Sequence, residues 1–346
     1  MRTKVYGTIG PSCCEEEVLV SLFEKGMTGV RINLSHVNLS EVTDWIENIK
    51  RAYEQVKKHN PNQPELEMLI DLIGPEMRLG ELLSEREIHA GDKLTVMAEG
   101  KTNLFDPTEL PIPKPVFEKL EVGTSLLIDD GKILLEVEEK RSRAAECVVV
   151  RGGTLRSEKS IAIPGVSFET PTLTESDIKN ISEAKEYGIT GVMLPFVRGK
   201  EDLCNLEGAL AEAGAKDMRV LAKIENEVGV NKLPELLPFC DEIVIARGDL
   251  GNAISLWDLP VVQARIAKLC NDSGKPFMIV TQMLASMEKR AVPTRAEVSD
   301  IFRAVQEGAA SVMLTGETAA GKYPVESIEY MVNTVRAAEE YVSEGV

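Results

Sequence analysis

A (β/α)8 (TIM) barrel with a small all-β domain inserted into it is the fold that this sequence predicts. Short apolar runs recur along the 346 residues, and most of them are followed by an amphipathic helical pattern. Eight such strand-and-helix units can be recognised, and eight units favour a closed barrel over a doubly wound sheet. The pattern is interrupted between about residues 80 and 159, where short alternating strands separated by Gly, Asp and Pro turns indicate the insert.

The three units before the insert are predicted from the signals that flank them. The first strand leads through a Gly-Pro-Ser turn into an amphipathic helix near residues 15–25, which Gly26 ends. The second strand is followed by a long helix over residues 40–58, with Trp45 and Ile49 on its apolar face. The three strands are expected at residues 4–9, 29–33 and 68–72.

The insert and the second half of the chain complete the expected architecture. In the insert, strands are expected at residues 93–97, 125–137 and 147–150. A helix over residues 174–187 follows, and its Thr-Glu-Ser-Asp opening is typical of a capped N-terminus. Five further barrel strands are expected at residues 191–194, 219–222, 242–245, 276–280 and 311–314. The barrel is therefore assigned to residues 1–79 and 160–346, and the β-rich insert to residues 80–159.

Composition restricts the class of partner. The formal net charge of −17 argues against a nucleic-acid backbone or an anionic membrane as the main partner. No run approaches the roughly 18 apolar residues of a membrane span, and the first residues lack a signal-peptide core. We therefore expect a cytoplasmic protein. The six cysteines contain no CxxC pair, so neither a zinc site nor a disulfide framework is indicated.

Two neighbouring stretches carry the side chains that most clearly indicate a reactive or ligand-binding site. Lys223 and Glu225 follow an apolar run, and because residues two apart in a strand share a face, they should project together. Asp249 comes after the next apolar run. An ammonium beside two carboxylates can hold a divalent cation together with a phosphate or enolate oxygen. The alternative is a buried Lys–Glu ion pair with Asp249 as a helix cap.

Polar side chains follow most of the predicted strands, at the end where barrels keep their active sites. Arg31, Arg78 and Lys223 supply the local positive charge that an anionic substrate needs in an acidic protein. Taken singly, each of these residues could equally form a rim ion pair or a turn. The strand-end groups are Ser12, Arg31, Asn33, Ser35, His36, Asp71, Arg78, Pro195, Phe196, Lys223, Glu225, Arg247, Asp249, Thr281, Gln282, Thr315 and Glu317.

Nine segments of the chain resemble, in order, the sequence pattern of the pyruvate kinase family. They include Arg-Ile-Asn-Leu-Ser-His at 31–36, Lys-Ile-Glu-Asn at 223–226 and Ala-Arg-Gly-Asp-Leu-Gly at 246–251. One such string would be a weak signal, but nine in sequence cover nearly the whole chain. The other six lie at residues 8–12, 74–78, 128–131, 281–284, 293–297 and 316–319.

The resemblance implies a glycolytic kinase that transfers the phosphoryl group of phosphoenolpyruvate to ADP, giving pyruvate and ATP. By resemblance, Glu225 and Asp249 hold Mg²⁺ or Mn²⁺. Lys223 stabilises the phosphoryl group during transfer, and Arg31 binds phosphate. The amides of Gly248 and Asp249 receive the substrate carboxylate together with Thr281, whose hydroxyl is also assigned to catalysis. The insert corresponds to the lid of the family.

The resemblance also implies a potassium site and a nucleotide site. Asn33, Ser35 and Asp71 offer one charge and several neutral oxygens, which suits a monovalent cation better than Mg²⁺. The potassium ligands implied by the resemblance are Asn33, Ser35, Asp71 and the carbonyl of Leu72. The residues implied on the nucleotide side are His36, Arg78, Asn33 and Lys159.

Four departures from the family pattern keep two other functions open. Ile73 stands where the family usually has Lys, Ala162 where Asn is usual, and Pro195 where Ser is common. The C-terminal domain of the family is expected to be missing, and any homo-oligomer would form through the barrel. A metal-dependent pyruvate-enolate lyase or aldolase is one alternative function. A non-catalytic paralogue that binds phosphoenolpyruvate or nucleotide is the other.

Overall fold

The computed structural model describes residues 2–344, except residues 36, 100–107, 130, 167 and 169. His36, which the sequence assigns to the nucleotide side, lies outside the described residues. The chain divides into two compact units. The first consists of Met1–Gly74, Thr172–Arg247 and Pro260–Val346, and the second of Pro75–Pro171 and Gly248–Leu259.

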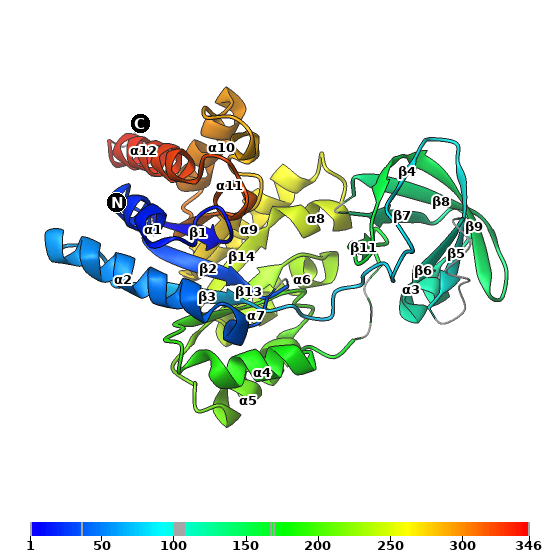
Figure 1. Ribbon diagram of the computed structural model, residues 1–346, viewed down its shortest axis with the longest axis horizontal. Helices are drawn as coiled ribbons and strands as arrows, with labels where there is room; N and C mark the ends of the chain where they lie inside the picture. Colours follow the sequence, from blue (N-terminus) through cyan, green and yellow to red (C-terminus); the bar gives the residue numbers. More distant parts are fainter. Residues whose placement is uncertain are drawn as a thin grey trace. The chain divides into compact units, whose positions relative to one another are not determined.

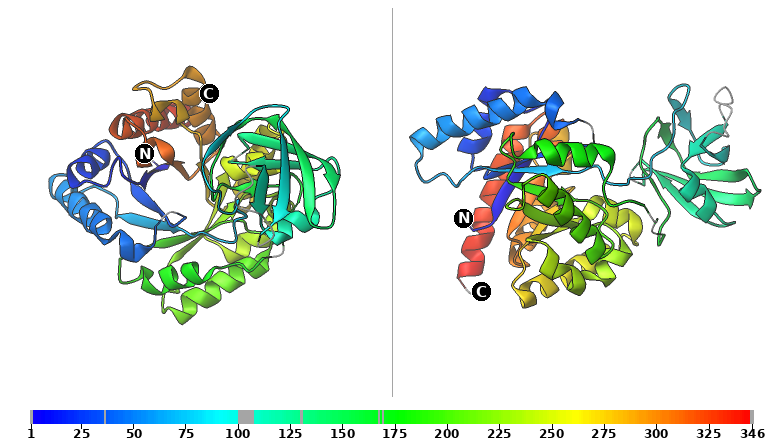
Figure 2. Two further views of the ribbon diagram at one scale, coloured as in Figure 1. Left: turned by 45° about the vertical axis from the view of Figure 1, so that its right-hand side comes forward. Right: turned by 90° about the horizontal axis from the view of Figure 1, so that it is seen from below.

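Eight parallel strands form a closed barrel in the first unit, which confirms the predicted fold. The strand order is β1-β16-β15-β14-β13-β12-β3-β2, so strands that follow one another along the barrel chain pair, and the first pairs with the last. Figures 1 and 2 show the helices packed around the outside of these strands. The strands are β1 (Lys4–Ile9), β2 (Gly29–Asn33), β3 (Glu67–Asp71), β12 (Gly191–Leu194), β13 (Arg219–Ile224), β14 (Glu242–Ala246), β15 (Phe277–Val280) and β16 (Ser311–Leu314).

The barrel strands are apolar because both of their faces are buried. Every residue of β12, β14, β15 and β16 is buried, which is typical of parallel strands covered by helices on one side and by the barrel core on the other. The continuous apolar runs in the sequence are the result of this burial. One core cluster of buried side chains joins seven of the strands: Tyr6, Leu69, Met193, Leu221, Val244, Ala246, Met278, Val280 and Met313.

The helices of the first unit match most of the predicted positions. The predicted long helix is interrupted, because Val42 leaves the helical conformation (φ −123°). An Asn38–Glu41 capping box lies at the N-terminus of the short helix before it. No helix within the described ranges is both long and apolar enough to cross a bilayer. The helices are α1 (Glu16–Glu24), η1 (Leu39–Glu41), α2 (Thr43–His59), α4 (Glu175–Ala184), α5 (Lys200–Glu212), α6 (Glu227–Asn231), α7 (Leu233–Leu236), η2 (Leu237–Phe239), α9 (Leu259–Ser273), η3 (Ala285–Glu288), α10 (Arg295–Gln306), α11 (Gly316–Ala319) and α12 (Pro324–Ser343).

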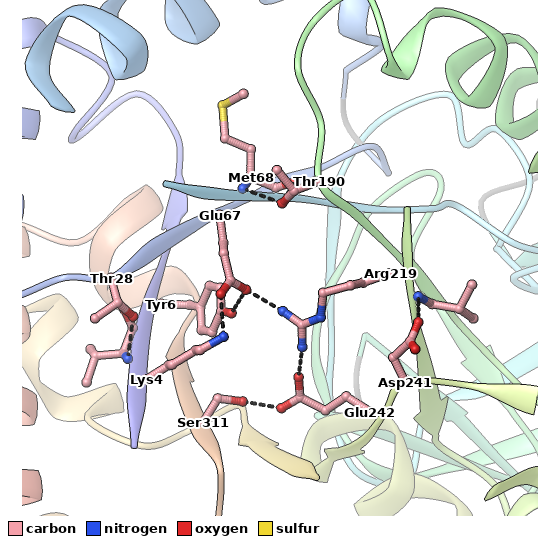
Figure 3. Close-up of polar contacts among 12 residues, drawn as sticks. Lys4, Tyr6, Thr28, Glu67, Met68, Thr190, Arg219, Asp241, Glu242 and Ser311 are labelled. Carbon is pink, nitrogen blue, oxygen red and sulfur yellow. Dashed lines mark hydrogen bonds and ion pairs between the residues drawn. The ribbon is translucent and has the colours of Figure 1, made fainter. Parts of the chain in front are cut away.

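The N-terminal ends of the barrel strands carry a connected set of buried and part-buried charged and polar side chains, here called the N-terminal network (Figure 3). Glu67 accepts from Lys4 and from Arg219. Arg219 also donates to Glu242 at 2.5 Å, and Ser311 donates to the other oxygen of Glu242 at 2.5 Å. The members of the network are Lys4, Tyr6, Glu67, Arg219, Glu242 and Ser311.

Burial and charge act in opposite directions on the two carboxylates of this network. Burial alone would raise the pKa of Glu67, but hydrogen bonds from Lys4 and Tyr6 and the charge of Arg219 hold the pKa below its ordinary value. Burial raises the pKa of Glu242, and its partners only partly offset that effect. The pKa of Tyr6 is raised by burial and by the neighbouring Glu67 carboxylate.

The second unit is rich in strands, as the sequence predicts, but it also contains a short helix, α3 (Lys114–Lys119), and α8 (Arg247–Ala253) begins directly after β14. A six-stranded sheet has the order β11-β7-β8-β9-β5-β6, and β10 pairs with β4. The strand predicted over residues 125–137 is a hairpin, because Asp129 and Gly131 adopt left-handed conformations (φ 53° and 75°) between β7 and β8. The strands are β4 (Arg86–Ile88), β5 (Lys93–Ala98), β6 (Glu109–Ile112), β7 (Ser125–Ile128), β8 (Ile133–Lys140), β9 (Ala144–Arg151), β10 (Gly153–Leu155) and β11 (Ile161–Ala162).

Candidate active site

Four charged side chains meet at the C-terminal ends of three barrel strands, and we call them the rim cluster: Arg31, Asp71, Lys223 and Glu225. Arg31 on β2 donates to Asp71 Oδ2 from Nε and Nη2, at 3.0 and 2.5 Å. Lys223 Nζ lies 3.1 Å from Asp71 Oδ1 and 2.9 Å from Glu225 Oε1. The structure thus confirms that Lys223 and Glu225 project together, and it adds a contact to Asp71 that spacing alone did not predict.

The rim cluster is buried and electrically balanced. The side chains of Arg31 and Lys223 are 11 % and 12 % exposed, and those of Asp71 and Glu225 are 3 % and 0 % exposed. Burial alone would raise the pKa of Asp71, but the charges of Lys223 and Arg31 outweigh burial and hold that pKa below its ordinary value. The two neighbouring cations thus favour the charged form of the Asp71 carboxylate.

Two carboxylate oxygens of the rim cluster are not fully satisfied. Asp71 Oδ1 and Glu225 Oε1 are buried and accept no aligned hydrogen bond from the part of the chain that the structure describes. Each lies within ion-pair distance of the Lys223 ammonium, at 3.1 and 2.9 Å. Buried carboxylate oxygens are normally hydrogen-bonded or bound to a cation. These two oxygens are therefore oriented in a way that suits a further cationic ligand.

A backbone amide orients Glu225. Phe196, just after β12, donates its N–H to Glu225 Oε2 at 2.7 Å. Phe196 has a φ of 53°, which is uncommon for a residue other than glycine and often marks a functional turn. The amide fixes one oxygen of Glu225 and leaves the other facing Lys223. Sequence reasoning singled out Pro195-Phe196 as a strand end but assigned no role to the Phe196 amide.

The residues assigned to potassium lie on adjacent strands. Asn33 at the end of β2 is paired in register with Asp71 at the end of β3. Asn33 Oδ1 accepts a hydrogen bond from Ser35 N at 3.3 Å. Leu72 is buried, and its amide donates to the Met193 carbonyl at 3.1 Å. The structure brings oxygen atoms of Asn33 and Asp71 to neighbouring strand ends, and their role as potassium ligands stays a prediction.

Thr281 follows β15 in a strained turn. Thr281 and Gln282 both have positive φ values, 71° and 54°. The Thr281 hydroxyl donates to the Val280 carbonyl at 2.6 Å. Arg247 donates to the Thr281 carbonyl at 2.8 Å from Nη2. The turn is therefore held in place by a side chain from the end of the neighbouring strand β14.

The remaining predicted site residues belong to the second unit. Arg78 pairs with Glu76 at 2.5 Å and donates to the Glu158 carbonyl at 2.8 Å. Lys159 pairs with Asp129 at 3.0 Å. Gly248 and Asp249 lie in the first turn of α8 and are grouped with this unit. The pairing of Asp249 with Glu225 around a divalent ion, and the nucleotide contacts of Arg78 and Lys159, stay predictions.

Comparison with known proteins agrees with this geometry. A family model described as the pyruvate kinase barrel domain matches residues 1–328. The chain belongs to the pyruvate kinase family. It is 36 % identical to a pyruvate kinase of Bacillus licheniformis and 34 % identical to one of Clostridium perfringens, and each match covers 98 % of this chain. A pyruvate kinase of Thermococcus litoralis is 36 % identical over 98 % of the chain.

The chain spans only part of its relatives. It covers 57 % of the length of the Bacillus pyruvate kinase, and 70 % of the length of the Clostridium and Thermococcus proteins. Family membership therefore rests on the barrel and its insert. The activity of the whole relatives comes to this chain as a proposal.

A buried aspartate of this pyruvate kinase family member, Asp177, fixes the segment that leaves β3. Its carboxylate accepts hydrogen bonds from the amides of Ile73 and Gly74, at 2.8 and 3.1 Å, and also caps α4 through Thr174. The Thr174–Asp177 capping box was visible in the sequence, but the contact to β3 was not. The departure at Ile73 thus leaves its backbone firmly held.

Pro195, the third residue that departs from the family pattern, packs closely against Gly74. A Cβ atom at Gly74 would lie 2.6 Å from Pro195 Cγ, and the φ of Gly74 is 61°. Glycine is needed here on both counts. Ala162 lies in the short strand β11, which pairs with β7, so its departure affects the second unit.

Proposed function

We propose that this protein is a pyruvate kinase that transfers the phosphoryl group of phosphoenolpyruvate to ADP. Family membership and the geometry of the rim cluster both support this function. The observation that carries most weight is the position of Lys223 between two buried carboxylates whose facing oxygens, among the described residues, lack aligned hydrogen bonds. A cluster built only for stability would satisfy those oxygens, as the N-terminal network does.

The donor set fits a divalent cation, Mg²⁺ or Mn²⁺. Glu225 presents one buried oxygen without an aligned hydrogen bond from the described chain, and Asp249 is proposed as its partner ligand. Within the described ranges, no group of three His, Cys, Asp or Glu side chains forms a metal site. In kinases, Mg²⁺ is typically held by one or two carboxylates together with substrate oxygens. When bound, such an ion would neutralise the negative charge that develops on phosphate and enolate oxygens.

Arg31 and Lys223 are proposed to bind the phosphoryl group and to stabilise its charge during transfer. Phosphoryl transfer leaves little covalent work for the protein, so fixed positive charges should carry much of the acceleration. Asp71 contacts both cations, at 2.5 Å and 3.1 Å, and so holds them in one orientation. Lys223 shares a strand face with Glu225, and its ammonium is therefore proposed to lie on the side of the cation where the phosphoryl group moves.

The proposed reaction has two steps. In the first, the bond between phosphorus and the enol oxygen breaks while a bond forms to an oxygen of the ADP β-phosphate, leaving the enolate of pyruvate. In the second, the enolate takes up a proton at its methylene carbon and becomes pyruvate. Thr281, through a water molecule, is proposed to direct that proton, and the amides of Gly248 and Asp249 to receive the substrate carboxylate.

The proposal includes a monovalent cation and a nucleotide site. Asn33, Ser35, Asp71 and the Leu72 carbonyl are proposed to bind K⁺, supported by the register of Asn33 with Asp71. Arg78, Lys159, Asn33 and His36 are proposed on the nucleotide side. Glu76 pairs with Arg78 and so adds a carboxylate beside that arginine. An extra negative charge of this kind is consistent with a requirement for K⁺.

A coupled assay for pyruvate formed from phosphoenolpyruvate and ADP tests the proposal. We expect activity that needs Mg²⁺ or Mn²⁺ and disappears in EDTA, and that is faster in K⁺ than in a bulky organic cation at equal ionic strength. Pyruvate release without ADP would favour the lyase or aldolase. Binding of phosphoenolpyruvate without turnover would favour the non-catalytic paralogue.

A further inference from the structure

The loop after β15 is held in a conformation that its residues do not favour on their own. Thr281 and Gln282 both lie in the left-handed region, and Thr281 is β-branched, for which a positive φ is a genuine outlier. Such backbone persists only where the surrounding structure fixes it. The loop carries the hydroxyl that the proposed function assigns to substrate and proton handling. What fixes the loop therefore bears on catalysis.

Glu317 is the first group that fixes the loop. It lies in α11, directly after β16, and is 1 % exposed. Its Oε1 accepts the amide of Leu284 at 3.0 Å, and its Oε2 accepts the amide of Thr315 at 2.8 Å. One carboxylate thus ties the loop after β15 to the loop after β16. Leu284 and the preceding Met283 are fully buried, so the loop is anchored immediately after its strained residues.

Arg247 is the second group that fixes the loop. Its Nη2 donates to the Thr281 carbonyl at 2.8 Å, while its Nη1 pairs with Asp300 of α10 at 2.6 Å. The side chain of Arg247 is only 10 % exposed. Asp300 therefore sets the direction of the guanidinium, and the guanidinium holds the carbonyl of the strained threonine. Arg247 thus binds the carbonyl of Thr281, and Glu317 binds the amide of Leu284 three residues later.

We propose that Glu317 is a positioning residue of the proposed kinase, which sets the place of the Thr281 hydroxyl without touching substrate. The inference rests on the proposed function, because it gives Thr281 a role in turnover. Both carboxylate oxygens of Glu317 accept backbone amides, and an amide side chain can offer only one acceptor oxygen. Glu317→Gln therefore keeps the volume of the side chain but must turn an NH2 group toward Leu284 N or Thr315 N. Because Oε2 also accepts the Thr315 hydroxyl at 3.3 Å, we expect the amide oxygen to stay on that side, so that the NH2 group faces Leu284 N and the bond to the loop after β15 is lost.

The expected effect is on kcat. A small displacement of a reacting group typically costs up to about 100-fold in rate, so we expect Glu317→Gln to lower kcat about 10- to 100-fold. The KM for phosphoenolpyruvate should stay within about threefold, since ground-state binding is shared with Arg31 and the amides of Gly248 and Asp249. Thr281→Val removes the hydroxyl from an isosteric side chain and should lower kcat in the same way.

A double-mutant cycle of Glu317→Gln and Thr281→Val tests the proposal. If Glu317 acts through the Thr281 hydroxyl, the double variant has the kcat of Thr281→Val alone. If the two losses multiply, or if Glu317→Gln keeps the wild-type kcat, the proposal is wrong. Glu242→Gln is the matched control, because Glu242 is equally buried at the other end of the barrel and should leave kcat unchanged.

Two further measurements keep the proposal testable if activity or folding fails. Asp300→Asn weakens the ion pair that orients Arg247. Because the Asp300 side chain is 32 % exposed, the protein should still fold, and kcat should fall less than in Glu317→Gln. Hydrogen exchange at the Leu284 amide reports the tie directly, and it should speed up in Glu317→Gln but not in Glu242→Gln. An inactive wild-type protein with that exchange pattern would reject the proposed function and keep the loop geometry. Unchanged exchange in Glu317→Gln would reject the tie itself.

Discussion

Each end of the barrel brings two cations and two carboxylates together, but the carboxylate oxygens have different partners at the two ends. In the N-terminal network, both oxygens of Glu67 and both oxygens of Glu242 accept hydrogen bonds from side chains (Figure 3). In the rim cluster, Asp71 Oδ1 and Glu225 Oε1 have ion-pair contacts to Lys223 and no aligned hydrogen bond within the described part of the chain. Charged groups of the same kind thus form two different arrangements. In the N-terminal network every carboxylate oxygen accepts a hydrogen bond, which we call closed, and in the rim cluster two accept none from the described residues, which we call open.

The comparison teaches how a barrel separates stability from function. Leaving buried carboxylate oxygens without hydrogen bonds is unfavourable, and it persists where a ligand is meant to complete the set. In barrels of this kind, active sites lie at the C-terminal ends of the strands, whereas the N-terminal ends serve stability. The two ends have the same number of charged groups. They differ in whether every carboxylate oxygen accepts a hydrogen bond from the described part of the chain.

The largest effect should come from breaking the open cluster. Lys223→Met removes the ammonium that faces Asp71 and Glu225, and we expect kcat to fall about 10²- to 10³-fold, the usual loss for one well-placed charge-stabilising group. Steady-state kinetics should show little change in the KM for phosphoenolpyruvate, because Arg31 remains. Exchange of the pyruvate methyl protons should survive, since Lys223 is assigned to phosphoryl transfer.

The opposite kinetic result would change the assignment of Lys223. If KM rose 100-fold (about 2.7 kcal/mol of binding) while kcat stayed constant, Lys223 would be a simple binding residue. The non-catalytic reading of the protein would then gain support.

A smaller effect, and one on stability alone, should come from breaking the closed network. Arg219→Met leaves Glu67 and Glu242 without their shared partner. Breaking a buried ion pair costs about 3–5 kcal/mol, and because the Arg219 side chain is 31 % exposed we expect about 2–3 kcal/mol here. Urea unfolding measures the loss. Per folded molecule, kcat should be unchanged, and a kcat loss as large as that of Lys223→Met would mean that the two ends are not separate.

The smallest effect concerns pH, and it has opposite signs for the two carboxylates of the closed network. The pKa of Glu67 is lowered from its ordinary 4.5, so its charge stabilises the fold above that pH and the gain is lost as the pH falls through the folded-state pKa. The pKa of Glu242 is raised from 4.5, so its ionisation destabilises the fold as the pH rises through the folded-state pKa.

Thermal unfolding of two variants at several pH values checks both signs. Relative to the wild type, the Tm of Glu67→Gln should fall as the pH rises toward and past 4.5, by a few degrees. The relative Tm of Glu242→Gln should rise as the pH increases above 4.5. Parallel curves for the two variants would show that the two carboxylates have the same environment.

The sequence predicted the barrel because burial on both faces makes each strand a continuous apolar run. Strands β1, β2, β12 and β16 have the predicted bounds. The errors lie where local geometry overrides a propensity pattern. Val42 interrupts the predicted long helix, the left-handed turn at Asp129 divides one predicted strand into a hairpin, and helix α3 in the insert was missed.

The candidate site was predictable only in part. The Lys223–Glu225 contact follows from the two-residue repeat of a strand, so the sequence is sufficient for it. The contact of Asp71 with Arg31 and Lys223 depends on which strands are neighbours and on their register. Asp177 and Glu317 act on backbone amides far away in the chain, and a backbone amide leaves no signature in the residue types of a sequence.

Binding of Mn²⁺ to the wild type, Glu225→Gln and Glu242→Gln tests most directly whether the open oxygens serve a cation. Water-proton relaxation measures this affinity without any turnover. We expect Glu225→Gln to lose more than about 100-fold in affinity, above the range for loss of an outer-shell partner, and Glu242→Gln to bind as the wild type does. Equal affinities in all three proteins, or equal losses in both variants, would contradict the account.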